Sequence, residues 1–235
     1  MLPKIAQPTF NTVLPSNNKK ITFRPFTVRE EKILLVAQAA NDADSMVQAM
    51  KQIINNCVVD SIDVDDMPSF DIEWLFLQLR AKSVGNVIEL RAEEDGKEVF
   101  IKIDLNEVKV KAATISNKML LDEQQGIGVV LRYPTFSVIE KLGKFNDESV
   151  DQSNLAFELF KEIVVAIYDA NDVYDVTMAE PGELDEFLQS MNAVQFRSIQ
   201  AFLEDMPYVY MDVSYTTPSG EEKSFRLQGL QDFFG

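Results

Sequence analysis

The chain has 235 residues, 46% of them hydrophobic, which is enough to bury a sizeable core in one large domain or two small ones. Its 38 acidic and 22 basic residues give a net charge of −16, which disfavours nucleic acid and anionic membrane surfaces as partners. Without histidine and with one cysteine, Cys57, the chain lacks the usual general base, the commonest transition-metal ligand and any intrachain disulfide, so we expect no enzyme, no cofactor and no metal.

Positive charge gathers at the beginning of the chain. Residues 1–29 carry a net charge of +5, which leaves −21 on residues 30–235. The basic residues are Lys4, Lys19, Lys20, Arg24 and Arg29. Four prolines predict that residues 1–26 form an extended arm, with a hairpin that pairs Thr9–Leu14 with Ile21–Arg24. The arm is either a tether to an acidic neighbour or a solvated linker.

Three helices are predicted in the first third. Thr27 and Glu30 have the spacing of a capping box, so a helix begins there. Its apolar stripe consists of Ile33, Leu34, Ala37 and Ala40. Apolar residues at three-and-four spacing predict a second helix over Met46–Val58. The third lies in Phe70–Gly85, where Asp71 is expected to be the N-cap.

The middle of the chain has the alternating polarity of β-strands. The dipeptide Asp95-Gly96 suits a tight turn that joins Ile88–Arg91 to Val99–Ile103 in a hairpin. Further strands are expected at Val108–Lys111 and Val129–Tyr133. A short helix from Thr135 to about Leu142 follows.

The last third returns to helices and closes with a hairpin. Periodicity predicts helices over Ser153–Tyr168 and Pro181–Met191. Asn192 and Gln195 form a capping pair for another helix, which Met206-Pro207 should end. The hairpin pairs Tyr208–Tyr215 with Ser224–Leu227.

This order of elements predicts an α+β fold, because helices alternate with antiparallel β-hairpins and no βαβ rhythm is present. We expect an extended basic arm over residues 1–26 and a subdomain of helices plus a hairpin over residues 27–125. A second subdomain, of helices plus the C-terminal hairpin, covers residues 126–235. Whether the two subdomains share one core is left open.

No stretch has the spacing of a catalytic or metal site. The acidic runs Asp60–Asp66 and Asp169–Asp175 lack the glycine that a calcium loop needs at its sixth position. Gly126-Ile127-Gly128 lacks the third glycine of a phosphate-binding turn. The candidate partner-binding residues are Phe23, Arg24, Phe26, Arg80, Phe233 and Phe234. The alternatives are packing of the aromatic side chains on the protein's own core and a structural salt bridge for Arg80.

The segment Phe70–Gly85 resembles a signature helix and exit turn of the T4-type bacteriophage baseplate hub assembly proteins. The other segments that carry the resemblance are Leu2–Lys4, Phe23–Leu35, Leu131–Thr135, Gln195-Phe196, Met206-Pro207 and Leu227–Phe234. Together they span nearly the whole chain. The resemblance implies a protein that helps to build the baseplate of a contractile phage tail.

The implied function is non-covalent binding to hub or other tail proteins, in the host cytoplasm during virion assembly or in the finished baseplate. An assembly chaperone and a subunit that stays in the virion are both compatible with the resemblance. Two alternatives from other classes are a carboxylate-dependent metal enzyme that uses the acidic runs, and an acidic mimic of nucleic acid. The contacted subunit and the oligomeric state are left open.

Overall fold

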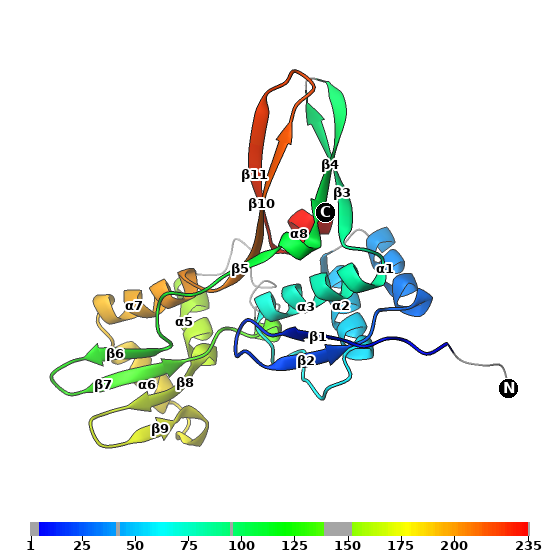
Figure 1. Cartoon of the computed structure of the whole chain (residues 1–235). Coiled ribbons are helices and arrows are strands. Elements are labelled where there is room, and N and C mark those ends of the chain that lie inside the picture. The colour runs from blue at the N-terminus through cyan, green and yellow to red at the C-terminus, as the bar shows by residue number, and fades with distance from the viewer. Residues whose placement is uncertain (1–4, 41–42, 95, 139–151, 235) are drawn as a thin grey trace. The chain divides into compact units, whose positions relative to one another are not determined.

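The computed structural model describes residues 5–40, 43–94, 96–138 and 152–234 (Figure 1). Its helices and small antiparallel sheets confirm the predicted α+β class. The contacts divide the chain into two compact units. Unit 1 comprises Met1–Lys111 and Pro207–Gly235, and unit 2 comprises Ala112–Met206.

Unit 1 begins with the predicted hairpin. Strand β1 (Phe10–Val13) pairs antiparallel with β2 (Lys20–Phe23). Ile21 and Phe23 are both buried, because residues two apart on a strand face the same side. The N-terminal segment therefore contributes side chains to the core of unit 1.

The hairpin is fastened to helix α3 (Ser69–Ser83). The backbone N–H of Ser16 donates to Asp71 Oδ1 at 3.0 Å, and Trp74 Nε1 donates to Thr12 Oγ1 at 2.9 Å. The prediction that Asp71 is the N-cap is wrong, because the helix begins two residues earlier and the buried carboxylate binds the β1–β2 turn instead.

Helices α1 (Val28–Ala40) and α2 (Ala43–Cys57) confirm the other two predicted helices of the first third. They pack against each other, and α2 also contacts α3. The buried apolar side chains of these helices are Ala37, Ala49, Met50, Ile53, Ile54, Cys57, Phe70, Ile72, Leu75, Phe76, Leu77 and Leu79. Cys57 is thus a core residue.

Two hairpins rise side by side in unit 1 (Figure 1). They are formed by β3 (Val87–Glu94) with β4 (Lys97–Asp104), and by β10 (Tyr208–Thr216) with β11 (Glu222–Gln228). Lys223 Nζ lies 2.6 Å from Glu94 Oε2, and the hydroxyl of Tyr215 also donates to Glu94. Both predicted hairpins are confirmed, and these contacts join them.

The end of the chain belongs to unit 1. After the turn η1 (Leu105–Glu107), β5 (Lys109–Lys111) pairs antiparallel with β10. Helix α8 (Gly229–Phe234) buries Phe233. The contacts between residues thus divide the chain after Lys111 and after Met206. The sequence predicted an arm that ends at residue 26 and two subdomains that meet between residues 125 and 126, and these ranges stay a prediction.

Unit 2 is a four-stranded antiparallel sheet with helices. The strands, in their order across the sheet, are β6 (Lys118–Asp122), β7 (Ile127–Leu131), β8 (Val164–Tyr168) and β9 (Val173–Asp175). The helices are α5 (Gln152–Ile163), α6 (Glu183–Ser190) and α7 (Ala193–Glu204), and η2 (Val176–Met178) is a short turn. The buried core consists of Val129, Leu131, Phe160, Ile163, Val164, Leu188, Ile199 and Phe202.

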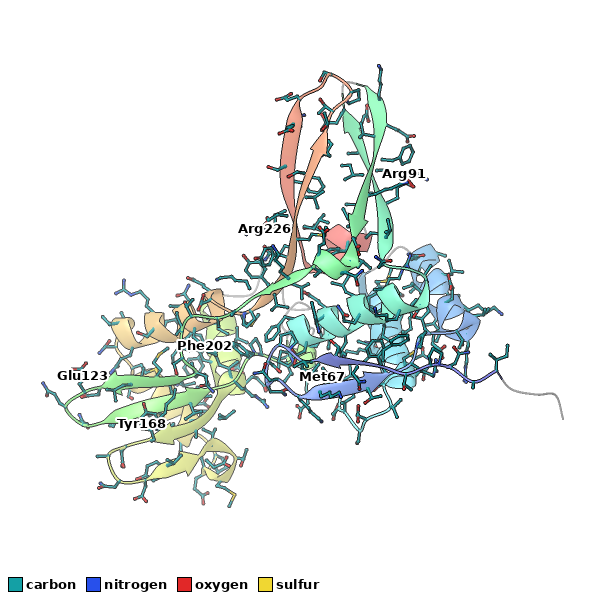
Figure 2. All side chains as sticks on the ribbon, viewed as in Figure 1. Met67, Arg91, Glu123, Tyr168, Phe202 and Arg226 are labelled. Carbon is teal, nitrogen blue, oxygen red and sulfur yellow. The ribbon has the colours of Figure 1, made fainter. Side chains whose placement is uncertain are left out.

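Aromatic rings pack against each other in the core of unit 2. The rings of Tyr133 and Phe202 are stacked, with centroids 5.1 Å apart, and Phe202 is labelled in Figure 2.

The start of α7 confirms the predicted capping pair: Asn192 Oδ1 accepts from the N–H of Gln195 at 3.1 Å, and Gln195 Oε1 accepts from the N–H of Asn192 at 2.9 Å.

One predicted helix is too long. The helix expected over Ser153–Tyr168 ends at Ile163, and β8 continues from Val164. Arg132 binds the last carbonyl groups of this helix: its N–H donates to the carbonyl of Ile163 at 2.8 Å, and its Nε donates to the carbonyl of Glu162 at 2.9 Å. The short helix expected from Thr135 to about Leu142 lies partly outside the described residues.

Candidate interaction site

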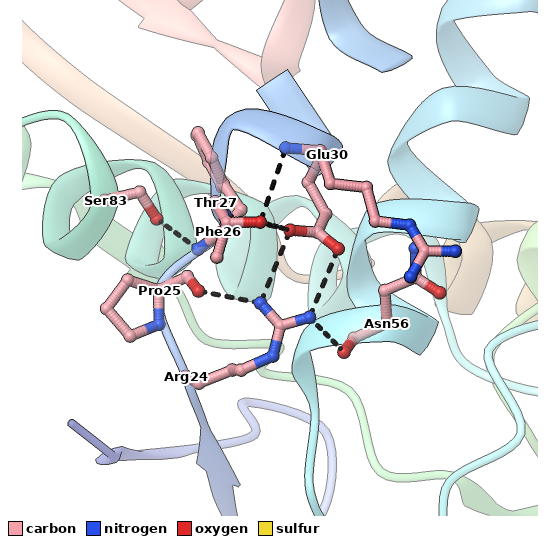
Figure 3. A network of polar contacts seen from close by, with 8 residues as sticks. Arg24, Pro25, Phe26, Thr27, Glu30, Asn56 and Ser83 are labelled. Carbon is pink, nitrogen blue, oxygen red and sulfur yellow. Dashed lines mark hydrogen bonds and ion pairs between the residues drawn. The ribbon is translucent and has the colours of Figure 1, made fainter. Parts of the chain in front are cut away.

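An ion pair holds the end of β2 to the beginning of α1 (Figure 3). Arg24 directly follows β2, and its guanidinium donates to Glu30 Oε1 at 3.2 Å and to Glu30 Oε2 at 3.4 Å. The same guanidinium donates to the carbonyl oxygens of Pro25 and Asn56, each at 2.9 Å. These bonds join the N-terminal segment, the first turn of α1 and the last turn of α2.

The carboxylate of Glu30 is stabilised in its charged form. Its side chain is 1% exposed, and burial opposes ionisation. Hydrogen bonds from Arg24 and Thr27 outweigh burial and lower the pKa of Glu30 to about 2. Thr27 donates to Glu30 Oε2 from its N–H at 2.8 Å and from its hydroxyl at 2.7 Å. At neutral pH the pair is therefore ionised.

The same residues position the first turn of α1. The N–H of Thr27 donates to Glu30 as in the predicted capping box, whereas Thr27 Oγ1 accepts from the N–H of Arg29 at 3.3 Å in place of that of Glu30. The N–H of Phe26 donates to Ser83 Oγ at 2.9 Å, and the ring of Phe26 is buried. The beginning of α1 is thus fixed to the end of α3.

Helix α1 presents an apolar face to solvent. Val28, Leu35 and Val36 are 78%, 57% and 71% exposed. With Lys32 and Ala39, which are also exposed, they follow the spacing of one helix face. The opposite face is also apolar and includes the buried Ala37. Exposed aliphatic side chains gathered on one helix face make that face a candidate for binding another protein.

The structure places most of the predicted partner-binding residues inside unit 1. Phe23, Phe26 and Phe233 are buried and pack within the protein's own core. Arg24 is engaged in the ion pair with Glu30. The rings of Phe23, Phe26 and Phe233 are therefore part of the core and are not accessible to a partner in this conformation.

The remaining two predicted residues lie elsewhere. Arg80 is half-buried near the end of α3, where its Nη1 donates to the carbonyl of Gly85 at 3.4 Å. Phe234 is in α8, and its side chain is outside the described part of the chain. Partner binding by either residue stays a prediction.

The sequence reasoning missed the exposed residues Leu35 and Val36. It followed the stripe that contains Ile33, Leu34 and Ala37, because such a stripe suffices to predict an amphipathic helix. The available signal was the run Ile33–Ala37, in which five consecutive apolar residues cannot all face one core.

Carboxylates of the two acidic runs bind groups of the protein itself. Asp60 accepts from the N–H of Thr22, and Asp65 lies 2.7 Å from Lys51 Nζ. Asp169 Oδ1 accepts from two N–H groups of its own turn. Within the described ranges, no group of three or more acidic, histidine or cysteine side chains is placed to hold a metal ion. The helices that the structure describes include none with the length and apolarity of a membrane span.

Comparison with known proteins identifies a family. A family model described as T4 bacteriophage base plate protein matches residues 7–235, which is nearly the whole chain. No curated protein and no solved structure matches the chain. The matched range includes the ion pair of Arg24 with Glu30 and the exposed face of α1.

Proposed function

Because the chain belongs to the family of T4 bacteriophage base plate proteins, we propose that it helps to assemble the baseplate hub by binding another tail protein non-covalently. The observation that carries this proposal is the exposed apolar face of α1, formed by Val28, Leu35 and Val36. A face of this kind suits a groove on a partner, since helix-in-groove recognition uses anchors that recur on one helix face, and Val28 and Leu35 have the i, i+7 spacing.

The free energy available at this face is sufficient for a specific contact. Complete burial of one large aliphatic side chain contributes about 1.5–3 kcal/mol, so Leu35 and Val36 can act as anchors. The ion pair of Arg24 with Glu30 fixes the helix before it binds, which lowers the ordering cost of association. Arg29, Glu31 and Lys32 are exposed beside the apolar side chains, so a groove rim with acidic groups opposite Arg29 and Lys32 and a basic group opposite Glu31 complements them.

The test is co-expression of the chain with each hub protein of the same phage, followed by size-exclusion chromatography and a measurement of affinity. We expect a stable complex for at least one hub protein. Replacing Leu35→Gln and Val36→Gln together should weaken it at least about tenfold, since both anchors are lost. The free energy of unfolding of the free protein should change by less than about 0.5 kcal/mol, because both side chains are exposed.

The matched control is Val194→Gln, which replaces an equally exposed aliphatic residue on α7 of unit 2. This variant should bind the hub protein as the unaltered chain does. Equal affinity of the double variant and the control would exclude the face of α1 as the binding surface. Absence of any complex would reject the assembly function itself.

Mass spectrometry of purified virions separates the two forms of the proposal. If the chain forms the complex and is absent from virions, it is an assembly factor that dissociates before the virion is complete. A chain that is present in stoichiometric amounts is a structural subunit of the baseplate.

A further inference from the structure

Unit 2 contains a cavity between the end of its sheet and the segment that follows. It has a volume of about 190 Å³. Its walls are formed by Ile167 of β8, Tyr174 and Asp175 of β9, Val176 of η2, and Ala179, Glu183 and Leu184. Most of these side chains are apolar, and Tyr174, Asp175, Ala179 and Glu183 are exposed, so the cavity is open to solvent.

Large apolar side chains are exposed on the cavity wall and next to it in the sequence. Val173, Tyr174 and Met178 are 70%, 52% and 84% exposed. Val173 precedes the wall residue Tyr174, and Met178 precedes the wall residue Ala179. An open, mostly apolar cavity with the exposed Tyr174 on its wall is suited to receive one side chain of a partner.

The size of the cavity restricts what can occupy it. Sites for drug-sized molecules have volumes of roughly 300–1,000 Å³, so this cavity is too small for one. An apolar cavity of about 150 Å³ is known to accommodate benzene. One leucine, methionine or phenylalanine side chain is therefore the occupant that the volume fits.

The negative charge around the cavity favours basic residues on either side of the side chain that enters it. Residues 169–186 contain seven acidic and no basic residues. Among the described residues, the ion pair that reaches this segment joins Lys161 Nζ to Asp185 Oδ1 at 3.3 Å. Asp175 and Glu183, on the cavity wall, accept from the N–H groups of Thr177 and Glu180, which leaves their charge in place.

We propose that this cavity binds a cationic segment of another protein, with one aliphatic or aromatic side chain in the cavity and lysine or arginine residues on either side. The apolar side chain supplies the affinity, and the flanking cations meet Asp175 and Glu183. This surface lies in unit 2, so it is separate from the face of α1 in unit 1 and does not depend on the function proposed for that face.

The test uses the full-length protein and the synthetic peptide Gly-Lys-Lys-Leu-Lys-Lys-Gly, with fluorescence anisotropy for affinity and ¹⁵N NMR for location. We expect saturable binding with amide shifts at Val176, Ala179 and Leu184. Replacement of the leucine of the peptide by serine should weaken binding at least about tenfold, and replacement of its lysines by glutamate should abolish it.

Two variants separate the cavity from the charge. Ala179→Phe places a ring in the cavity and should weaken binding about tenfold, whereas Ala193→Phe, the same change at an exposed position of α7, should not. Asp175→Asn with Glu183→Gln keeps oxygens that accept the N–H groups of Thr177 and Glu180, and should weaken binding roughly fivefold at low salt. The control with two charges removed elsewhere in unit 2 is Glu123→Gln with Glu204→Gln.

Several results would overturn the proposal. One is that the peptide does not bind, or binds equally well without its leucine. Another is that Ala179→Phe has no more effect than Ala193→Phe. A third is that sedimentation shows self-association that Ala179→Phe removes, because the occupant would then be a second copy of this chain. Loss of the hub complex in the Leu35→Gln, Val36→Gln variant tests the face of α1 and does not affect the interpretation of the peptide experiments on the cavity.

Discussion

Unit 1 and unit 2 use charge in different ways. In unit 1 the buried Glu30 is paired with Arg24, and the buried Asp71 binds the β1–β2 turn. In unit 2 the core cluster is apolar, and most acidic residues of 169–186 are exposed. A buried ion pair fixes geometry but makes stability depend on each partner, whereas an apolar core distributes its free energy over many contacts. Unit 1 should therefore be the more sensitive to single substitutions of charge.

The two units also differ in how the chain builds them. Unit 2 is one continuous segment, Ala112–Met206, whereas unit 1 needs both ends of the chain because β5 pairs with β10. Continuity makes unit 2 the candidate for independent folding, since its described strands, β6 to β9, pair with one another.

The largest expected effect comes from removal of residues 207–235. Unit 1 then loses β10, β11 and α8, which bury Val209, Met211, Val213, Leu227 and Phe233. We expect the rest of unit 1 to be unfolded and unit 2 to stay folded. Two-dimensional NMR should show dispersed amide signals for residues 112–206 alone. Dispersed signals from α1–α3 in this truncated chain would contradict the dependence of unit 1 on its C-terminal part.

Next in size is Arg24→Ala, which leaves the buried carboxylate of Glu30 without its partner. Loss of one partner of a fully buried ion pair costs about 3–5 kcal/mol of unfolding free energy; Arg24 is 27% exposed and Thr27 still donates to Glu30, so we expect a cost at the lower end of this range. Trp74 is the single tryptophan and lies in unit 1, so its fluorescence in urea reports this unit. The control is Arg226→Ala, since the pair of Arg226 with Asp212 is exposed; with its contact to the Tyr210 ring also lost, it should lower the urea midpoint much less than Arg24→Ala does. Equal urea midpoints for Arg24→Ala and Arg226→Ala would contradict the expectation that the Arg24–Glu30 pair contributes more stability than the exposed Arg226–Asp212 pair.

A third prediction concerns Glu73, whose Oε1 lies beside Gly229 at the start of α8. Burial raises the pKa of Glu73 to about 7. The unfolded-state pKa of a glutamate is about 4.3, so this residue favours the folded state most below pH about 4, and the stability decreases as the pH rises to about 7. We expect Glu73→Gln to raise the unfolding free energy by about 2–3 kcal/mol at pH 8 and to change it little at pH 4.

The comparison for Glu73 is Glu30, whose pKa is shifted in the opposite direction. The pKa of Glu30 is about 2, so the stability it contributes is present above pH about 4.3 and decreases as the pH falls toward 2. Glu30→Gln should therefore lower the unfolding free energy at pH 8. Urea titrations at pH 4 and pH 8 measure both variants, and the same sign of change at pH 8 would contradict the assignment.

The smallest of these effects is expected in unit 2, from Gly128→Ala. A Cβ at Gly128 would lie 2.2 Å from Tyr168 Oη and 2.4 Å from the carbonyl oxygen of Met119, so the ring and the strand must both shift. Figure 2 labels Tyr168 on β8. Overpacking of this kind costs about 1–3 kcal/mol. The fluorescence of Trp74 should keep its urea midpoint while the amide signals of β7 and β8 broaden or shift. A changed Trp74 midpoint would mean that the units unfold together.

Local signals were enough to predict many of the elements. The capping box at Thr27 and Glu30, and the pair of Asn192 and Gln195, located two helix starts correctly, because each satisfies N–H groups within its own first turn. The dipeptide Asp95-Gly96 located the hairpin of β3 and β4. Such signals act within a few residues and do not depend on the rest of the fold.

Other elements required partners that are distant in the sequence. The helix expected over Ser153–Tyr168 ends early because β7 pairs with Val164–Tyr168 and Arg132 binds the last carbonyl groups of α5. Asp71 binds Ser16 instead of capping α3. The exposed face of α1 and the cavity in unit 2 could not be predicted, because periodicity shows that a residue is apolar and not whether a neighbour covers it.

The sequence by itself determined the α+β class, most helix starts and the hairpins, since these depend on periodicity, capping and turn residues over short spans. Membership of the T4 base plate protein family rests on the match of the family model to residues 7–235. Tertiary structure alone decided that Glu30 is paired with Arg24, that the C-terminal strands complete unit 1, and that Leu35 and Val36 face solvent. The physical reason is that burial and pairing across long separations depend on how the elements pack, and one pattern of apolar residues is compatible with several packings.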